Sequence, residues 1–381
     1  MTNGLSRPRK QFLDVLRVLA TCAVVLMHVL TGATDVTDAS IMPEYRSLLL
    51  SVMDLVTWCV PIFLLISGYL FLNPERTLTY PVMIKKYCRR IALAILLFGV
   101  PYAASELVVA ERTIRPGMFP EAVKMALMGN TWSHMWYLYL ILFLYLITPL
   151  LKKVLQILPM WSVAAVMAFI FLGSSVAPFL NKVLDINSIP VLPDGGVYFL
   201  YYLCGYLFAR REARVDKDPA GMNGIDGISA GEKRGWNLWL VAAAVLALGM
   251  VLSRIFGFSI QMAYNYPFTV LLSVLLFAAG QNGRWGAAVP VAAEKHRIPW
   301  QEAGALSFAV YLVHPVYVNL FYKFVKFTPF TVLERCGVES VAAGNVLLLL
   351  LLLAFCLVVL TLATATAWVL RKIPVLRKYV L

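Results

Sequence analysis

A series of long apolar runs constrains this chain more than any other feature of its sequence. Most of the runs are about 20 residues long, the length at which an α-helix crosses the hydrocarbon core of a bilayer. The strands of a membrane barrel would instead alternate apolar and polar positions over about ten residues. Hydrophobic residues make up 61% of the 381 residues and charged residues only 14%, which is too apolar for a soluble domain of this length. The runs therefore predict an all-α, polytopic membrane protein.

The runs number about ten, each bounded by polar or charged residues. They lie at 12–32, 48–72, 91–110, 134–151, 160–180, 198–209, 236–257, 266–280, 304–322 and 342–370. We expect one integral membrane domain over residues 1–381, without cleavage of the first run. A polar segment rich in Gly, Asp, Lys and Arg, at about 210–235, is expected to form a flexible loop.

The distribution of Lys and Arg predicts how the chain is oriented in the membrane. Most of these residues lie in every second polar segment, and positively charged loops stay in the cytoplasm. The segments concerned are 73–90, 152–158, 210–235, 281–303 and the C-terminal tail. Both termini are therefore expected to be cytoplasmic. The formal net charge of +13 reflects this topology, so we expect the bilayer as a partner and no nucleic acid.

Within the first run, Arg17 and His28 are ionisable residues that a membrane helix does not need. Their separation of eleven residues brings them to within about 20° of the same helix face, about 16 Å apart along the axis. A charged side chain in the hydrocarbon region costs about 2.5–3.5 kcal/mol on insertion scales, so such residues usually face a bundle interior or a wet cavity. We therefore predict that Arg17 and His28 are functional.

No metal site is predicted. The six cysteines lie mostly inside or beside apolar runs, without the paired spacing of metal ligands, and read as small core residues.

Several stretches, taken in order, resemble the acyltransferase-3 family of integral membrane acyltransferases. They are Arg17 with ten residues before His28, PIFLLISGYLF, HMWYLYLI, YYLCGYLFARR and GALSFAVYLVHPV. The resemblance covers nearly all of the chain. It implies a ten-helix domain in a bacterial cell (inner) membrane that O-acylates cell-surface glycans. It also implies acyl-CoA, with acetyl-CoA preferred by analogy, as a cytoplasmic co-substrate with no permanently bound cofactor, and Arg17 and His28 as the functional pair.

Transfer of an acyl group from a thioester to an alcohol needs a base, and His28 is the natural candidate. An imidazole titrates near neutral pH, so it can accept the hydroxyl proton and return it to the departing thiolate. Direct transfer and an acyl-imidazole intermediate both remain open. Asp54, at a similar depth on the second run, is a candidate to orient His28 as the acid of a dyad. The alternative is that Asp54 is only an interfacial charge.

Arg17 is predicted to bind the phosphates or pantetheine carbonyls of the donor, because a guanidinium supplies several fixed hydrogen-bond donors. The alternative is an ion pair with Asp14, three residues earlier, and the two roles are compatible. Arg89 and Arg90 belong to a basic rim that either holds the donor phosphates or only sets orientation and binds anionic lipid. Ser67, beside Gly68, is predicted to contact the donor. The alternative is that these small residues only allow close helix packing.

For the acceptor, His134, Trp136 and Tyr137 are predicted to stack on and hydrogen-bond a sugar. The predicted topology places these three residues near the outer membrane surface, at a depth similar to that of His28 and Asp54, where Trp and Tyr are also common interfacial anchors. His314, near the middle of the ninth run, is either a site residue or a satisfied core histidine.

Two functions of different classes fit these residues. The first is an O-acyltransferase that moves an acyl group, acetyl by analogy, to a hydroxyl of a cell-surface glycan or its lipid-linked precursor. The second is a transporter or flippase of such a glycan, in which the buried charges gate a pathway.

Overall fold

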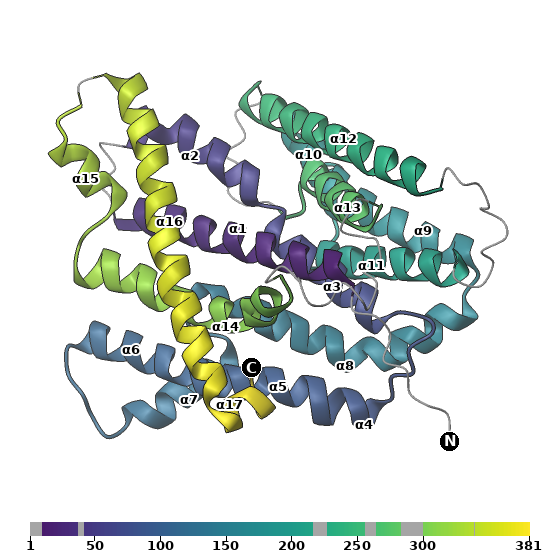
Figure 1. Ribbon diagram of the computed structural model, residues 1–381, viewed down its shortest axis with the longest axis horizontal. Helices are drawn as coiled ribbons and strands as arrows, with labels where there is room; N and C mark the ends of the chain where they lie inside the picture. The colour runs from purple at the N-terminus through teal and green to yellow at the C-terminus, as the bar shows by residue number, and fades with distance from the viewer. Residues whose placement is uncertain (1–9, 37–41, 216–226, 256–263, 283–299, 339) are drawn as a thin grey trace.

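The computed structural model describes residues 10–36, 42–215, 227–255, 264–282, 300–338 and 340–381. The regular elements among these residues are helical and none is a strand, which confirms the all-α prediction for the described part (Figure 1). The first helices are α1 (Gln11–Val36), α2 (Met42–Val56), α3 (Cys59–Phe71), α4 (Tyr80–Val82), α5 (Arg89–Ala94), α6 (Val100–Glu111), α7 (Met118–Met128), α8 (Trp136–Ile157), α9 (Met160–Phe171) and α10 (Ala177–Val183). The others are α11 (Gly195–Val215), α12 (Gly227–Ile255), α13 (Pro267–Asn282), α14 (Trp300–Asn319), α15 (Pro329–Arg335), α16 (Val341–Lys372) and α17 (Pro374–Tyr379).

Short π-helical and 3₁₀ segments join several of these helices into longer ones. Because of these joints, a single continuous span often carries several helix labels. The π-helical segments are Met83–Cys88, Ile95–Gly99, Leu172–Val176 and Leu320–Phe324, and the 3₁₀ turn is Ser133–Met135.

Seven helical segments of the described chain are long and apolar enough to cross a membrane, which confirms a multi-pass membrane protein. They are Gln11–Val36, Tyr45–Phe71, Tyr80–Glu111, Ser133–Ile157, Met160–Val183, Trp300–Arg335 and Val341–Lys372. Two shorter apolar helices, Asn237–Leu252 and Pro267–Asn282, accompany them. The count of ten spans and the cytoplasmic termini stay predictions.

Helix α1 is the central element of the bundle. It packs against α14, α3 and α16, and it lies in the middle of the molecule in Figure 1. In its most apolar window 67% of residues are buried, against 28% in α16, which crosses it at the outside. A helix enclosed by other helices is apolar on most sides, so few of its polar groups reach solvent. Three threonine hydroxyls of α1 instead donate to carbonyl oxygens of the same helix.

Helices α3 and α11 approach closely because each has a glycine at the crossing. A Cβ atom at Gly205 would overlap the backbone of Leu65, and one at Gly68 would overlap the backbone of Tyr202. Small residues allow this backbone contact between membrane helices. The crossing fixes the part of α3 that carries Ser67.

The second apolar run is broken into α2 and α3 at Thr57 and Trp58. Pro61 explains the break, because its ring clashes with the carbonyl four residues earlier and it has no N–H to donate. The Trp58 indole instead donates to the Leu55 carbonyl oxygen (2.7 Å). The break lets α2 and α3 contact different neighbours.

Parts of two segments that were expected to be loops are helical. The basic residues of the segment 73–90 lie mostly on a helix that begins at Tyr80, because a helix can continue beyond the hydrocarbon region where its charges meet water. Of the segment 210–235, both flanks are helical, in α11 and α12, and residues 216–226 lie outside the described residues.

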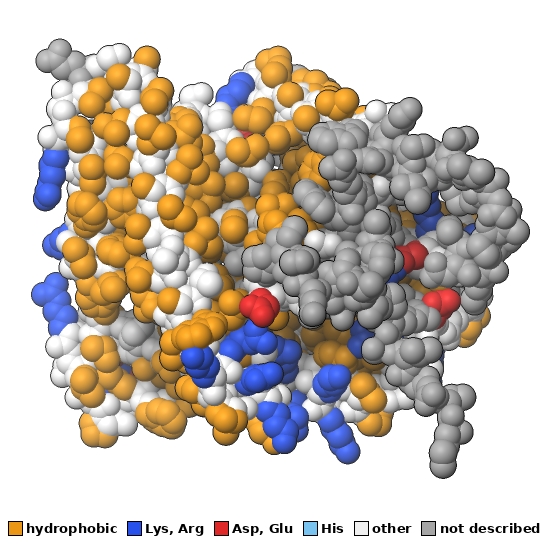
Figure 2. Space-filling view, in the orientation of Figure 1, with side chains coloured by type: hydrophobic (Ala, Val, Ile, Leu, Met, Phe, Trp, Pro, Cys, Tyr) orange, Lys and Arg blue, Asp and Glu red, His pale blue; other side chains and the backbone are white. Residues whose placement is uncertain are grey.

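The surface in Figure 2 shows a division that fits a membrane protein. Apolar side chains cover the face formed by α16, whereas Lys and Arg side chains gather beside its end, over α17, α5 and α4. This basic edge is the end of the bundle at which Arg90 and Arg371 lie.

Candidate active site

Three histidines from distant parts of the chain meet inside the bundle and form the histidine cluster (His28, His134 and His314). The ring centroids are 5.1 Å apart for His28 and His314, 6.2 Å for His28 and His134, and 5.8 Å for His134 and His314. His28 comes from α1, His134 from the 3₁₀ turn before α8, and His314 from α14. The packing of α1 against α14 therefore assembles the cluster.

Two nitrogen atoms of the histidine cluster have no partner among the described residues. His314 Nδ1 lies 3.1 Å from the Val310 carbonyl oxygen, which leaves its Nε2 unpaired. The Nε2 of His134 is also buried and unpaired. The exposed fraction is 3% for His134 and 0% for His314. A buried polar atom without a hydrogen bond is costly, so such an atom usually meets a water molecule or a ligand atom.

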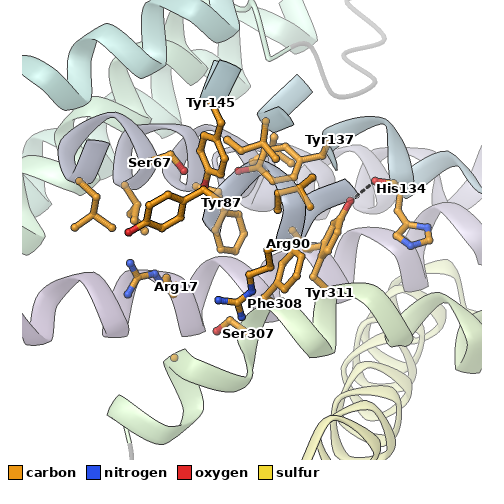
Figure 3. Close-up of a pocket in the computed structure, with 18 of the residues that line it drawn as sticks. Arg17, Ser67, Tyr87, Arg90, His134, Tyr137, Tyr145, Ser307, Phe308 and Tyr311 are labelled. Carbon is orange, nitrogen blue, oxygen red and sulfur yellow. Dashed lines mark hydrogen bonds between the residues drawn. The ribbon is translucent and has the colours of Figure 1, made fainter. Parts of the chain in front are cut away.

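The position of His134 is fixed by its backbone and by aromatic neighbours. Its carbonyl oxygen accepts a hydrogen bond from the Tyr311 hydroxyl (2.5 Å), drawn as a dashed line in Figure 3. Its ring packs edge-on against Tyr311, with centroids 5.6 Å apart, and at a tilt against Tyr102, with centroids 5.7 Å apart. The Tyr102 hydroxyl donates to the Leu312 carbonyl oxygen of α14 (2.6 Å). These contacts tie the short turn that carries His134 to α14.

A cavity of about 470 Å³ extends from the histidine cluster along α1, and we call it the large cavity. His28 and His134 lie on its wall together with three arginines, Arg17, Arg90 and Arg371. Figure 3 shows Arg17 and His134 at opposite ends of this space. The remaining wall is largely aromatic and aliphatic, and no Asp or Glu side chain lines it among the described residues.

Arg17 lines the large cavity while it is paired with Asp14, so the predicted ion pair is confirmed and the pair does not take Arg17 away from the cavity. Arg17 Nη1 lies 2.8 Å from Asp14 Oδ1, and the exposed fractions are 24% for the arginine side chain and 2% for Asp14. Helix α14 can lie against this pair because residue 304 is glycine, where a Cβ would sit 2.9 Å from Asp14 Oδ1. The buried carboxylate therefore holds the guanidinium at the wall.

The two neighbouring arginines of the basic rim have different positions. Arg90 lines the large cavity, and it donates to the carbonyl oxygens of Val380 (2.7 Å) and Leu381. Arg89 is exposed, lies over the Tyr379 ring at 5.0 Å and lines neither cavity next to the histidines. The prediction that Arg89 binds the donor is therefore not supported by its position, because successive residues of a helix point about 100° apart.

The other predicted residues divide between the cavity wall and the interior. Ser67, Trp136 and Tyr137 all line the large cavity, so the predicted donor and acceptor residues share one space. Figure 3 shows Ser67 beside Tyr145. His314 lines neither cavity and lies behind His28 and His134, which suits a positioning role rather than acceptor contact.

A second space of about 260 Å³, the small cavity, lies on the other side of His28 and His134. Both histidines line both cavities. The small cavity has a different wall, with two carboxylates, one lysine, an amide, hydroxyls and an indole. Its side chains include Thr31, Asp35, Glu106, Trp132, Ser133, Asn319, Tyr322 and Lys323.

Asp54 is not part of this site, and the proposed dyad with His28 is not formed. Its carboxylate Oδ2 lies 3.3 Å from Arg254 Nη2, which also contacts the Ser51 hydroxyl at 3.0 Å. Asp54 lines a third pocket, distinct from the large and small cavities, beside α12 and α13. The break at Thr57 explains the separation, because it lets α2 pack against α12 while α3 continues to the large cavity.

Several residues on the two walls were not singled out from sequence. For Asp35 a signal existed, since it follows His28 by seven residues, which returns to nearly the same helix face. For Arg371, whose Nε is buried and unpaired among the described residues, and for Trp132, no local pattern indicated a site. No group of three or more His, Cys, Asp or Glu side chains in the described chain has the geometry of a metal site.

Comparison with known proteins bears on this geometry. A family model described as an acyltransferase domain, that of the acyltransferase-3 family, matches residues 10–368. That range contains the histidine cluster and the walls of the small cavity, and it leaves out only the last residues that touch the large cavity. No curated protein and no solved structure matches the chain significantly.

Proposed function

Because the chain belongs to the acyltransferase-3 family of integral membrane acyltransferases, we propose that it is an O-acyltransferase of a bacterial inner membrane. It moves an acyl group, acetyl in the first instance, from cytoplasmic acyl-CoA to a hydroxyl of a cell-surface glycan or its lipid-linked precursor. One observation carries this proposal: two cavities of different chemistry meet at His28 and His134.

The large cavity suits the donor. Its three arginines match the phosphates of a coenzyme A thioester, because guanidinium groups bind phosphate by paired hydrogen bonds and stay charged. Its aromatic and aliphatic wall suits the uncharged pantetheine arm. Arg17 and His28 are about 16 Å apart along α1, close to the reach of an extended arm. A donor whose phosphates rest on the arginines thus presents its thioester at the histidines.

At the histidines, the reaction is a simple exchange of bonds. The acceptor hydroxyl oxygen attacks the thioester carbonyl carbon while His28 takes the hydroxyl proton. The carbon–sulfur bond then breaks, the acyl group remains on the acceptor oxygen as an ester, and the imidazolium returns the proton to the thiolate. Since cavities adjoin His28 on two sides, donor and acceptor can bind at the same time, which supports direct transfer.

Mass spectrometry of surface glycans tests the proposal. Cells that produce the protein should gain the mass of one acyl group per modified sugar, and cells with His28→Ala should lose it while the variant still inserts in the membrane. The opposite result is movement of a glycan across sealed vesicles with no acyl product and no consumption of acyl-CoA. That result would establish a transporter or flippase instead.

A further inference from the structure

The small cavity is lined by a buried histidine whose hydrogen bonding the fold leaves incomplete. His134 is 3% exposed and lines this cavity, and its Nε2 has no partner among the described residues. Asp35, Asn319 and Ser133 line the same cavity, and their oxygens and amide can each hydrogen-bond a hydroxyl group. A ligand with several hydroxyl groups would satisfy these atoms better than an apolar one.

The size of the small cavity limits what it can hold. Its volume of about 260 Å³ falls below the about 300–1,000 Å³ of pockets for drug-sized ligands. It therefore suits one small polar unit, with the rest of a larger molecule outside. Trp132 supplies an aromatic wall whose orientation is fixed, because its ring stacks on Tyr102 with centroids 4.1 Å apart and planes 4° apart. An indole held in this way can pack against the carbon face of a sugar ring.

The charges that face the small cavity are unequal. Among the described residues, the ionisable groups on its wall besides His28, His134 and Tyr322 are Asp35, Glu106 and Lys323. Lys323 acts electrostatically on Glu106, so one carboxylate is balanced. Asp35 has no ion pair with any residue that the structure describes. The cavity therefore carries a net negative charge.

We propose that the small cavity is the acceptor site, and that it selects sugar or polyol units that are neutral or carry an amine over units that carry a carboxylate. The inference rests on the proposed acyl transfer and adds the class of acceptor. The attacking hydroxyl binds near His134 and His28, and a second substituent of the same unit faces Asp35. An anionic substituent there meets a like charge at a partly enclosed surface, where screening is weaker than in bulk water.

Cysteine labelling tests the charge of the cavity without requiring acyl transfer. In full-length protein in lipid nanodiscs, Ser133→Cys is treated with a cationic and an anionic methanethiosulfonate of similar size, and the labelled peptide is quantified by mass spectrometry. The cationic reagent should react about tenfold faster, the lower end of electrostatic focusing in clefts. Adding Asp35→Asn should bring the ratio close to unity. Adding Glu111→Gln, which alters a carboxylate paired with Arg115 outside the cavity, should leave the ratio unchanged.

Protection by sugars then tests the ligand class. Methyl glycosides of a neutral hexose, a hexosamine and a hexuronic acid are added at equal concentration before labelling. The neutral and amine sugars should slow the labelling of Ser133→Cys at least threefold, and the uronic acid should not. Exposed Cys336, which does not line the cavity, is the internal control and should label at the same rate throughout.

The outcomes separate this inference from the proposed function. Equal or better protection by the uronic acid overturns the charge selection, and no protection by any sugar overturns the acceptor site. Either result can occur while the protein still transfers acyl groups from acetyl-CoA. Conversely, protection as expected with no acyl transfer to any glycan would leave a sugar site in a protein that is not an acyltransferase.

Discussion

The large and small cavities share His28 and His134 but differ in charge, size and surface. Three arginines and many aromatic rings line the large cavity, whereas two carboxylates, one lysine and small polar groups line the small one. The difference shows that the same two imidazoles can adjoin two binding sites, each of which favours ligands of a different charge. A polyanionic ligand would be attracted to the large cavity and repelled by the small one.

The largest expected effect comes from removing the imidazole that both cavities share. His28→Ala should reduce acyl transfer by about 10²–10⁴-fold, the usual contribution of a general base, while KM for acetyl-CoA stays within a few-fold. Transfer of a radiolabelled acetyl group in membrane vesicles measures the effect, and gel filtration of the purified variant checks folding. Full activity in a well-folded variant would show that His28 is not the general base, and that its position between the two cavities is not needed for acyl transfer.

The next effect separates two adjacent arginines. Arg90→Ala should raise KM for acetyl-CoA by about ten- to a hundredfold, because a hydrogen bond to a charged group contributes about 1.5–3 kcal/mol. Arg89→Ala is the matched control, since Arg89 is exposed and outside the large cavity, and its KM should stay close to that of the unaltered protein. Steady-state kinetics decide the matter. Equal effects of the two substitutions would mean that the basic rim acts only through its total charge.

A smaller effect sharpens the charge of the small cavity. Lys323→Gln removes the one lysine among the described residues that line this cavity, so the preference of Ser133→Cys for the cationic labelling reagent should rise about two- to threefold. The same substitution should leave KM for acetyl-CoA unchanged, because Lys323 does not line the large cavity. A change in KM of similar size would show that the two sides are not electrically separate.

The smallest kinetic effect is expected outside both cavities. Asp54→Asn should keep acyl transfer within about twofold, because Asp54 pairs with Arg254 rather than His28. Loss of this partly exposed pair should lower the free energy of unfolding by less than about 1 kcal/mol, seen as a small shift of the thermal midpoint in detergent. A hundredfold loss of activity in a variant of normal stability would restore the dyad hypothesis.

The first apolar run was the most predictable part of the site. Its helical length and the shared face of Arg17 and His28 follow from the helix repeat, and the structure places both residues on the wall of the large cavity. The pair with Asp14 was also visible as a spacing of three residues. Such local relations within one helix need no knowledge of other helices.

The partners of His28 were less predictable, as Asp54 and His134 illustrate. Both were assigned a similar depth from topology, yet His134 lies beside His28, whereas Asp54 pairs with Arg254. Depth in a membrane gives one coordinate only, and it does not say which face of a helix is turned toward which neighbour. The helix break before Pro61 separates Asp54 from His28, because α2 packs against α12 while α3 continues to the large cavity.

By itself, the sequence determined that this chain forms long apolar helices, and that the central one carries a cation and an imidazole on one face. A backbone in hydrocarbon must satisfy its own hydrogen bonds, and the spacing within a helix is then set by its repeat. Only the tertiary structure decided that His134 and His314 stand beside His28 and that two unlike cavities meet there. The packing of α1, α8 and α14 determines these contacts, because the fit between side chains that are far apart in the sequence decides which helix faces are in contact.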